Sequence, residues 1–251
     1  MAPSDMTLFG MLRRLILAFA LAVLVIGALC FFGIWIPNEP SKQKYPIRGI
    51  DVSHHQGSVN WNQVRADGIR FAYIKATEGA DFTDAKFAEH WRESSAAGVV
   101  HGAYHFFTLG TSGQSQAANF IAHVPADENA LAPAIDLEFS GYNRDRRPSA
   151  DDFQRELSVF WDAIVEHYGK VPVVYTASDF QKQYLLAMPI ERLWIREVIL
   201  IPASGWTLWQ FSPRGRVSGV RGFVDLNVFR GDDAEFEKMT RRETRTSEPT
   251  R

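Results

Sequence analysis

The chain has 251 residues and a formal net charge of -2 at pH 7, because 27 Lys and Arg side chains face 29 Asp and Glu. This balance excludes a general electrostatic attraction to nucleic acid, so partners must be sought at specific sites. The hydrophobic share of 46% is ample for one sizeable folded domain, and a single cysteine, Cys30, excludes a disulfide within the chain.

The first element in chain order is an uncharged, mostly apolar run from Leu15 to Ile36, with Arg13 and Arg14 directly before it. A helix needs about 20 residues to cross a bilayer, whereas a signal peptide has a core of about 7 to 15 apolar residues and then a small-residue cleavage site. The run is long and no such site follows it. The pattern predicts an uncleaved transmembrane signal anchor at 15–36.

The flanking charges indicate the orientation of this span. Its two preceding arginines favour a cytoplasmic position for residues 1–14, although Lys42, Lys44 and Arg48 reduce the asymmetry. We therefore expect a single-pass protein of the cytoplasmic membrane, with the rest of the chain on the extracytoplasmic side, in the periplasm or cell wall.

Two polar segments bound the folded part of the chain. Residues 37–46, PNEPSKQKYP, are proline-rich and predict a linker, whereas residues 240–251 lack apolar periodicity and predict a disordered tail. One folded domain is expected between them, at 47–239.

Within that domain, short apolar runs alternate with longer amphipathic ones. Ser149 predicts a helix N-cap, and Gly98 and Gly169 predict helix C-terminal caps. The helical patterns are 59–68, 82–98, 111–124 and 149–169. The strand patterns are 47–53, 71–77, 99–107, 131–139, 171–177, 191–197, 205–212 and 222–229. This alternation predicts a mainly parallel α/β sheet, closed into a barrel or open, and the loss of helical patterns toward the C-terminus argues against a regular eightfold barrel.

Polar and aromatic side chains fall at the end of nearly every strand pattern. In parallel α/β folds the carboxyl ends of the strands meet at one face, on which sites are built. We therefore expect one cleft, to which the strand ends contribute Asp51, Lys75, Glu78, Tyr104, His105, Asp136, Glu138, Tyr175, Trp194, Trp209, Gln210 and Asp225.

The most informative members of this set are Asp136 and Glu138. Residues i and i+2 of a strand face the same side, so both carboxyl groups can share one pocket. Two such groups in a partly dry cleft cannot both ionise freely, so one of the two pKa values should rise and provide an acid near neutral pH. Cleavage of a glycosidic bond needs this pairing of an acid and a negative charge. A bare Asp-x-Glu also occurs at solvated strand ends and at metal sites.

Other residues of the set leave alternatives open. The aromatic residues Tyr104, Tyr175, Trp194 and Trp209 can stack on sugar rings or belong to the core. His54 and His55 beside Asp51 suggest a metal site, but no ligand spacing supports one, and we expect neither a metal nor a cofactor. Lys75 suits a Schiff base, but an ion pair to a cleft carboxylate explains it more simply.

The motifs of the domain, taken together, resemble glycoside hydrolase family 25, the Chalaropsis-type lysozymes or N-acetylmuramidases. The resemblance runs from about Arg48 to Phe229 and rests on eight ordered motifs: GIDVSHHQGSVNW, FAYIKATEG, HGAYHFF, PAIDLE, VYT, LWI, WQFS and VDLNVF. It implies an irregular TIM-like barrel with reduced helix content, and cleavage of the β-1,4 bond between N-acetylmuramic acid and N-acetylglucosamine in peptidoglycan.

The same resemblance implies roles for individual residues. Glu138 corresponds to the general acid and Asp136 to the partner that stabilises the charge at the anomeric centre. Asp51 and Asp225 correspond to the other acidic positions of the cleft. The substrate-binding set then comprises Tyr104, Tyr175, Trp209, Gln210, Lys75 and His105. Whether Asp136 acts as a nucleophile or assists attack by the substrate's own acetamide oxygen stays open.

The chain departs from the family pattern after Trp194. Family members continue LWI with a small residue and soon an aromatic one, whereas this chain has Arg196, Glu197 and a short VILIPASG loop at the cleft. The expected partners are peptidoglycan glycan strands and, through the N-terminal helix, the cytoplasmic membrane, with no nucleic acid and a monomeric state. A catalytically idle, membrane-tethered peptidoglycan-binding module is the alternative function.

Overall fold

The computed structural model of the chain describes residues 3–186 and 188–242. They belong to two compact units that divide between Pro37 and Asn38. The first contains helix α1, Pro3–Phe31, which is long and apolar enough over Phe9–Phe31 to cross a membrane. Signal sequences near an N-terminus share this length and composition, so α1 is a candidate span. Residues 243–251 of the predicted tail lie outside the described residues.

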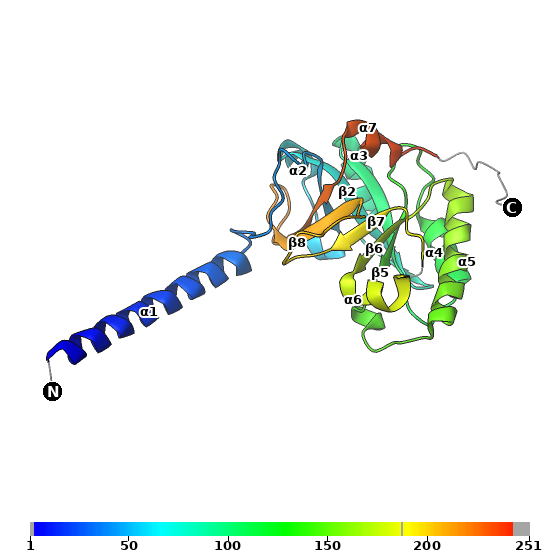
Figure 1. The fold of residues 1–251 in the computed structure, drawn as a ribbon. Coiled ribbons are helices and arrows are strands. Elements are labelled where there is room, and N and C mark those ends of the chain that lie inside the picture. Colours follow the sequence, from blue (N-terminus) through cyan, green and yellow to red (C-terminus); the bar gives the residue numbers. More distant parts are fainter. Residues whose placement is uncertain (1–2, 187, 243–251) are drawn as a thin grey trace. The chain divides into compact units, whose positions relative to one another are not determined.

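The second unit is a closed eight-stranded barrel (Figure 1). Six strands, β2 to β8 without β3, run parallel to one another. Strand β9 pairs antiparallel with β8, and β1 closes the barrel by pairing parallel to β2 and antiparallel to β9. The strands are β1 Arg48–Val52, β2 Ile69–Glu78, β4 Val100–Phe106, β5 Ala134–Leu137, β6 Val173–Ala177, β7 Leu193–Arg196, β8 Leu208–Gly215 and β9 Val224–Phe229. All eight predicted strands are present, and the irregular barrel is confirmed.

The helices follow the early strands. They are α2 Trp61–Ala66, α3 Phe87–Ala96, α4 Gly113–His123 and α5 Ala150–Tyr168, and after β6 only the short α6 Ser178–Phe180, the π turn Gln181–Leu185 and α7 Asp233–Lys238. Two 3-10 turns, His54–Gln56 and Gly141–Asn143, complete the list. Helix content therefore falls toward the C-terminus, as predicted.

Helix α5 shows how the sequence encodes these boundaries. The Ser149 side chain accepts a hydrogen bond from Asp152 N at the start, and Gly169 at the end adopts a left-handed conformation with φ 66° and donates to Val165 O. The predicted helix over 82–98 is wrong at its start. Phe82–Thr83 form strand β3, which pairs antiparallel with the end of β2.

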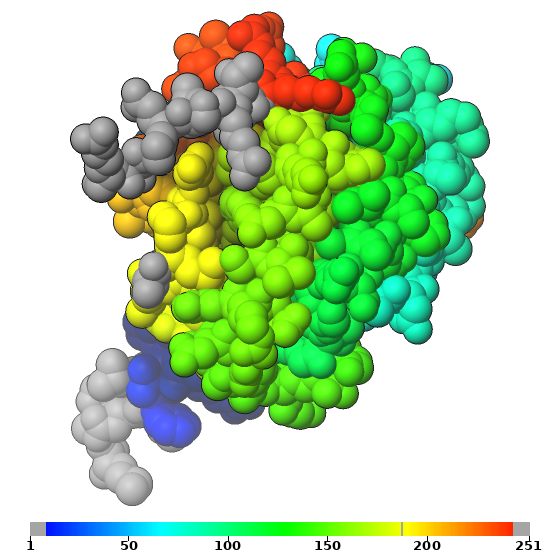
Figure 2. Space-filling view, turned by 90° about the vertical axis from the view of Figure 1, so that its right-hand side faces the viewer, coloured from blue at the N-terminus to red at the C-terminus, as the bar shows by residue number. Residues whose placement is uncertain are grey.

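Two apolar cores hold the domain together. The outer core lies between the barrel and its helices, where α3 and α4 contact β2 and α5 packs on α4. Figure 2 views the side of the domain on which α5 and the neighbouring green segments form the surface. The inner core fills the barrel itself, with the rings of Phe71 and Tyr73 from β2 at its centre.

Glycines make room for these two rings. The Phe71 ring lies over Gly49 of β1, and the Tyr73 ring lies 2.8 Å from where a Cβ of Gly102 in β4 would stand. A side chain at either position would collide with the ring, so the small residues on two strands complement the large ones on a third. This end of the barrel is thereby closed, and the opposite end carries the polar strand ends.

The compact unit begins earlier than the predicted boundary at Ile47. Asn38 and Pro40 are buried, and Arg48 donates to Pro40 O at 3.0 Å and to Glu39 Oε1 at 2.8 Å. Residues of the proposed linker are therefore packed against the barrel.

Candidate active site

The carboxyl ends of the barrel strands surround one pocket of about 400 Å³. Its size fits the range of small-ligand sites. The residues that line it are Asp51, Tyr104, Asp136, Glu138, Phe139, Ser140, Tyr175, Ala177, Asp179, Trp194, Arg196, Gln210, Pro213 and Asp225. All four predicted acidic residues therefore meet in one place.

Asp136 and Glu138 reach this pocket from the end of β5. Asp136 is 8% exposed, and its Oδ1 is buried with no hydrogen-bond partner among the described residues. Burial, and next the Glu138 carboxylate, raise the pKa of Asp136 well above its ordinary value. Glu138 is more open to solvent and accepts a hydrogen bond from Ser140 Oγ at 2.7 Å. An unpartnered buried carboxyl oxygen beside a more accessible carboxyl group is suited to a ligand that supplies the missing partner.

Asp51 is held by two amides from β8 and β9. Gln210 Nε2 and Asn227 Nδ2 donate to its Oδ2 at 3.0 and 2.7 Å. The amide oxygens in turn accept from the Tyr175 hydroxyl at 3.0 Å and from Trp194 Nε1 at 2.8 Å. These outer donors fix the orientation of both amides, so that each presents its NH₂ group to the carboxylate.

Asp225 lies opposite Asp51 in the antiparallel pairing of β9 and β1. Burial raises the pKa of Asp51 to about 6, with the two amide bonds opposing the rise. Burial and then the charge of Asp51 raise the pKa of Asp225 well above its ordinary value, and Arg196 opposes this. Each of the two buried carboxyl groups therefore makes ionisation of the other less favourable.

A family match accompanies this geometry. Residues 50–220 match the family described as glycosyl hydrolases family 25. The chain belongs to glycosyl hydrolase family 25.

Three similar proteins illustrate the match. Lysozyme M1 of Streptomyces globisporus is 32% identical over 205 residues, which cover 76% of this chain and 70% of that protein. The N,O-diacetylmuramidase of Chalaropsis sp is 34% identical over 206 residues, 72% of this chain and 95% of that protein. The structure of a family 25 glycosyl hydrolase from Bacillus anthracis has a TM-score of 0.76 and 36% identity, and the match covers 81% of this chain and 97% of that one.

Two predicted substrate-binding residues, Trp209 and His105, are buried outside the pocket described above, and a third, Lys75, does not line it. Trp209 is fully buried, packs on Trp206 and Phe211, and donates from Nε1 to Glu197 O at 2.7 Å. His105 is also fully buried, and it stacks on the Phe160 ring of α5 in the outer core. Each follows or precedes a strand residue that faces the pocket, and adjacent strand residues face opposite sides.

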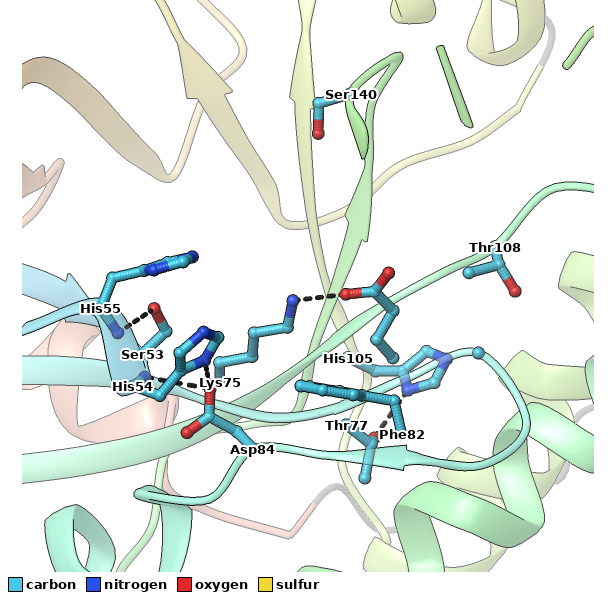
Figure 3. Close-up of polar contacts among 12 residues, drawn as sticks. Ser53, His54, His55, Lys75, Thr77, Phe82, Asp84, His105, Thr108 and Ser140 are labelled. Carbon is cyan, nitrogen blue, oxygen red and sulfur yellow. Dashed lines mark hydrogen bonds and ion pairs between the residues drawn. The ribbon is translucent and has the colours of Figure 1, made fainter. Parts of the chain in front are cut away.

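Lys75 lies beside the family 25 pocket rather than in its lining. Its Nζ forms the predicted ion pair with a carboxylate of the strand-end set, Glu78 Oε2 at 2.6 Å, and Figure 3 draws this contact from Lys75 as a dashed line. Glu78 does not line the pocket. His105, one strand away, bonds through Nδ1 to Thr77 Oγ1 at 2.7 Å, also drawn in Figure 3. Lys75 still acts on the site at a distance, because its charge opposes the rise in the pKa of Asp136.

His54 and His55 are explained without a metal. His54 Nδ1 lies 2.7 Å from Asp84 Oδ2, and the two histidine rings are in contact with centroids 4.1 Å apart (Figure 3). In the described part of the chain, no group of three or more His, Cys, Asp and Glu side chains is arranged to hold a metal ion.

Sequence reasoning did not assign four polar residues to the site, namely Asn227, Arg196, Ser140 and Asp179. Asn227 and Arg196 lie two residues from Asp225 and Trp194 along their strands, so the period of two that linked Asp136 to Glu138 would have found them. Ser140 was not singled out because it follows the end of β5, where no periodicity guides the prediction.

Proposed function

We propose that the domain is a lysozyme, an N-acetylmuramidase that hydrolyses the β-1,4 bond between N-acetylmuramic acid and N-acetylglucosamine in peptidoglycan. The observation that carries this is the pair Asp136 and Glu138 at the end of β5, which lines a pocket with one buried carboxyl oxygen left unpartnered. The relatives named lysozyme and N,O-diacetylmuramidase support the same activity.

In the proposed reaction Glu138 is the general acid. It is the more accessible carboxyl group of the pair, and Ser140 Oγ supports its Oε1, so its other oxygen is available to the leaving group. Glu138 transfers a proton to the glycosidic oxygen as the bond to the anomeric carbon breaks.

Asp136 then stabilises the positive charge that develops on the sugar. The unpartnered Oδ1 of Asp136 can accept the N–H of the substrate's 2-acetamido group, and this hydrogen bond favours the ionised form of Asp136. The acetamido oxygen attacks the anomeric carbon and forms an oxazolinium ion. Water, deprotonated by Glu138, opens this ion with overall retention of configuration.

A carboxylate nucleophile is the other route open to the pair. A covalent glycosyl adduct on Asp136, trapped with a fluorinated substrate analogue and found by peptide mass spectrometry, would replace the substrate-assisted route. A free oxazoline product or inhibition by a thiazoline analogue would support the substrate-assisted route.

The remaining polar residues position the sugar. Asp51, fixed by Gln210 and Asn227, and its neighbour Asp225 present acceptors for hydroxyl or amide groups. Tyr104, Tyr175 and Trp194 provide the flat surfaces of the same wall.

The activity is tested by digestion of purified peptidoglycan with residues 38–251 and analysis of the new reducing ends by mass spectrometry. The truncation is reasonable because the matched region makes up 95% of the Chalaropsis enzyme. New reducing-end N-acetylmuramic acid is expected. Co-sedimentation with glycan but no new ends would favour the idle binding module instead.

We further propose that α1 anchors the domain in the cytoplasmic membrane, with the pocket on the extracytoplasmic side. Retention of full-length protein in the membrane fraction after carbonate washing, with an intact N-terminus by mass spectrometry, is the expected result. A shortened N-terminus in the soluble fraction would identify a cleaved signal sequence. The expected monomeric state is tested by light scattering of residues 38–251.

A further inference from the structure

The loop after β7 exposes three consecutive aliphatic side chains. Ile199, Leu200 and Ile201 are 78%, 67% and 68% exposed, in a stretch where sequence comparison with family motifs indicated a shortened, altered loop. Single exposed apolar residues are ordinary on a protein surface, whereas a contiguous apolar tip marks an interaction site.

The loop is built so that its tip can leave water. Glu197 Oε1 accepts hydrogen bonds from the backbone N–H groups of both Ile199 and Leu200, each at 3.0 Å. These two donors are therefore satisfied within the loop itself. In an apolar medium an unpaired backbone donor costs several kcal/mol, and this arrangement avoids that cost.

The first residues of the second unit contact the start of the same loop. The apolar run ends at Ile36, and Asn38 follows two residues later, so their Cα atoms are at most about 7.6 Å apart. Asn38 is buried in the domain, where its Nδ2 donates to Glu197 O at 3.4 Å and to Phe211 O at 3.3 Å. Glu197 is the residue that begins the aliphatic loop.

We infer that Ile199, Leu200 and Ile201 insert into the lipid bilayer surface next to the point where the chain leaves it. This rests on the proposed span, because connectivity then holds the loop near the membrane whatever the position of the domain. Trp35 falls at the end of the apolar run, where tryptophan is enriched at membrane interfaces, and the exposed Lys42 and Lys44 can approach anionic headgroups.

Docking of this kind would also orient the catalytic pocket. Arg196 lines the pocket and lies three residues before Ile199, so the rim of the pocket would rest near the membrane surface. The glycan cleaved would then be the layer closest to the bilayer.

The test places an environment-sensitive NBD probe at a single cysteine in the full chain, with Cys30→Ser as background. The variants are Leu200→Cys and, as a matched control, Val159→Cys, an exposed apolar position on α5 that is 43% exposed. Each is reconstituted in vesicles of phosphatidylethanolamine and phosphatidylglycerol that contain a lipid-borne quencher. Blue-shifted emission and strong quenching at position 200 but not at 159 are expected, and equal quenching at both would overturn the inference.

A second measurement separates the loop from the span. Residues 38–251, which lack α1, are sedimented with the same vesicles, and the triple variant Ile199→Ser, Leu200→Ser, Ile201→Ser should bind about tenfold less than the unaltered domain. If carbonate washing shows that α1 is not an anchor, this comparison still tests whether the loop binds the bilayer. Vesicle binding unchanged by the triple substitution, or self-association that it abolishes without any vesicle binding, would overturn the inference.

Discussion

The two ends of the barrel interior are lined by the same strands but do opposite things. Along β9, Phe229 at one end faces the apolar core, and Asn227 and Asp225 follow toward the pocket. Along β8, Leu208 is succeeded by Gln210 in the same way. One end is filled by rings and aliphatic side chains, whereas the other holds four carboxyl groups around open space.

This difference shows that the polar site occupies one end of the barrel interior and leaves the apolar packing at the other end intact. Two residues apart on a strand, two side chains face the same interior, but one packs in the apolar core and the other lines the polar site. The apolar layer supplies the burial energy, and the polar layer concentrates groups whose burial is unfavourable. Substitutions at the two ends should therefore separate stability from activity.

The largest effect is expected from Glu138→Gln at the polar end. The amide keeps the shape and removes the acid, so hydrolysis of peptidoglycan should fall by about 10²- to 10⁴-fold. Release of reducing ends measures the rate, and glycan co-sedimentation should be unchanged. A variant with near-normal turnover would remove Glu138 from the acid role.

At the apolar end, Phe71→Ala should reduce stability instead. Phe71 is fully buried against Gly49, and emptying its place in the inner core should cost about 3–5 kcal/mol of unfolding free energy. Urea denaturation of residues 38–251 measures this. The folded fraction should keep its specific activity; a loss of turnover in fully folded protein would mean that the two ends are coupled.

Asp51→Asn should raise the stability of the domain at neutral pH and lower its activity. The pKa of Asp51 is raised in the folded state to about 6, so its contribution to stability is fully present below its ordinary pKa and is lost as the pH rises through about 6. The variant should therefore be more stable than the unaltered domain at pH 7.5, with no gain at pH 4, and less active. Melting curves at both pH values decide this, and a gain at pH 4 alone would contradict the assignment.

Arg196→Gln should shift the pH dependence of activity. Arg196 opposes the rise in the pKa of Asp51 and of Asp225, so its removal should move the acidic limb of the pH profile upward and lower activity about tenfold at pH 7. Arg196→Lys should restore most of the profile, because it keeps the charge. Arg65→Gln, an exposed arginine on α2, is the matched control.

The smallest effect is expected from Trp209→Phe. The ring is kept but the hydrogen bond to Glu197 O is lost, which should cost about 1 kcal/mol of stability. Because Trp209 lies outside the pocket, KM for glycan should not change. A raised KM with unchanged stability would return Trp209 to the substrate-binding set.

Periodicity explains which parts of the site could be predicted from sequence. The strands and the meeting of Asp51, Asp136, Glu138 and Asp225 follow from apolar patterns and from the rule that parallel strands end at one face. These patterns left open whether the sheet closes, and only the resemblance to family 25 implied a barrel. The errors arose where both members of an adjacent pair were assigned to one pocket. Tyr104 faces the pocket and its neighbour His105 faces away from it. In the same way Gln210 faces the pocket and Trp209 faces away, so a strict alternation would have excluded one residue of each pair.

Tertiary contacts account for what no pattern could reveal. The orientation of Gln210 and Asn227 depends on donors from two other strands, Tyr175 and Trp194. The packing of Asn38 against Glu197 joins residues far apart in the sequence, and the proline-rich composition of that segment predicted a linker instead.

The pairing that closes the barrel also constrains how the protein can form. Arg48 in the first strand pairs with Val228 in the last, so the cylinder cannot be completed until nearly the whole domain is available. Contacts between distant parts of a sequence slow folding, because the loop between them must be ordered first. If α1 is the membrane span proposed above, the chain can cross the membrane while the domain is still open, and the barrel closes afterwards.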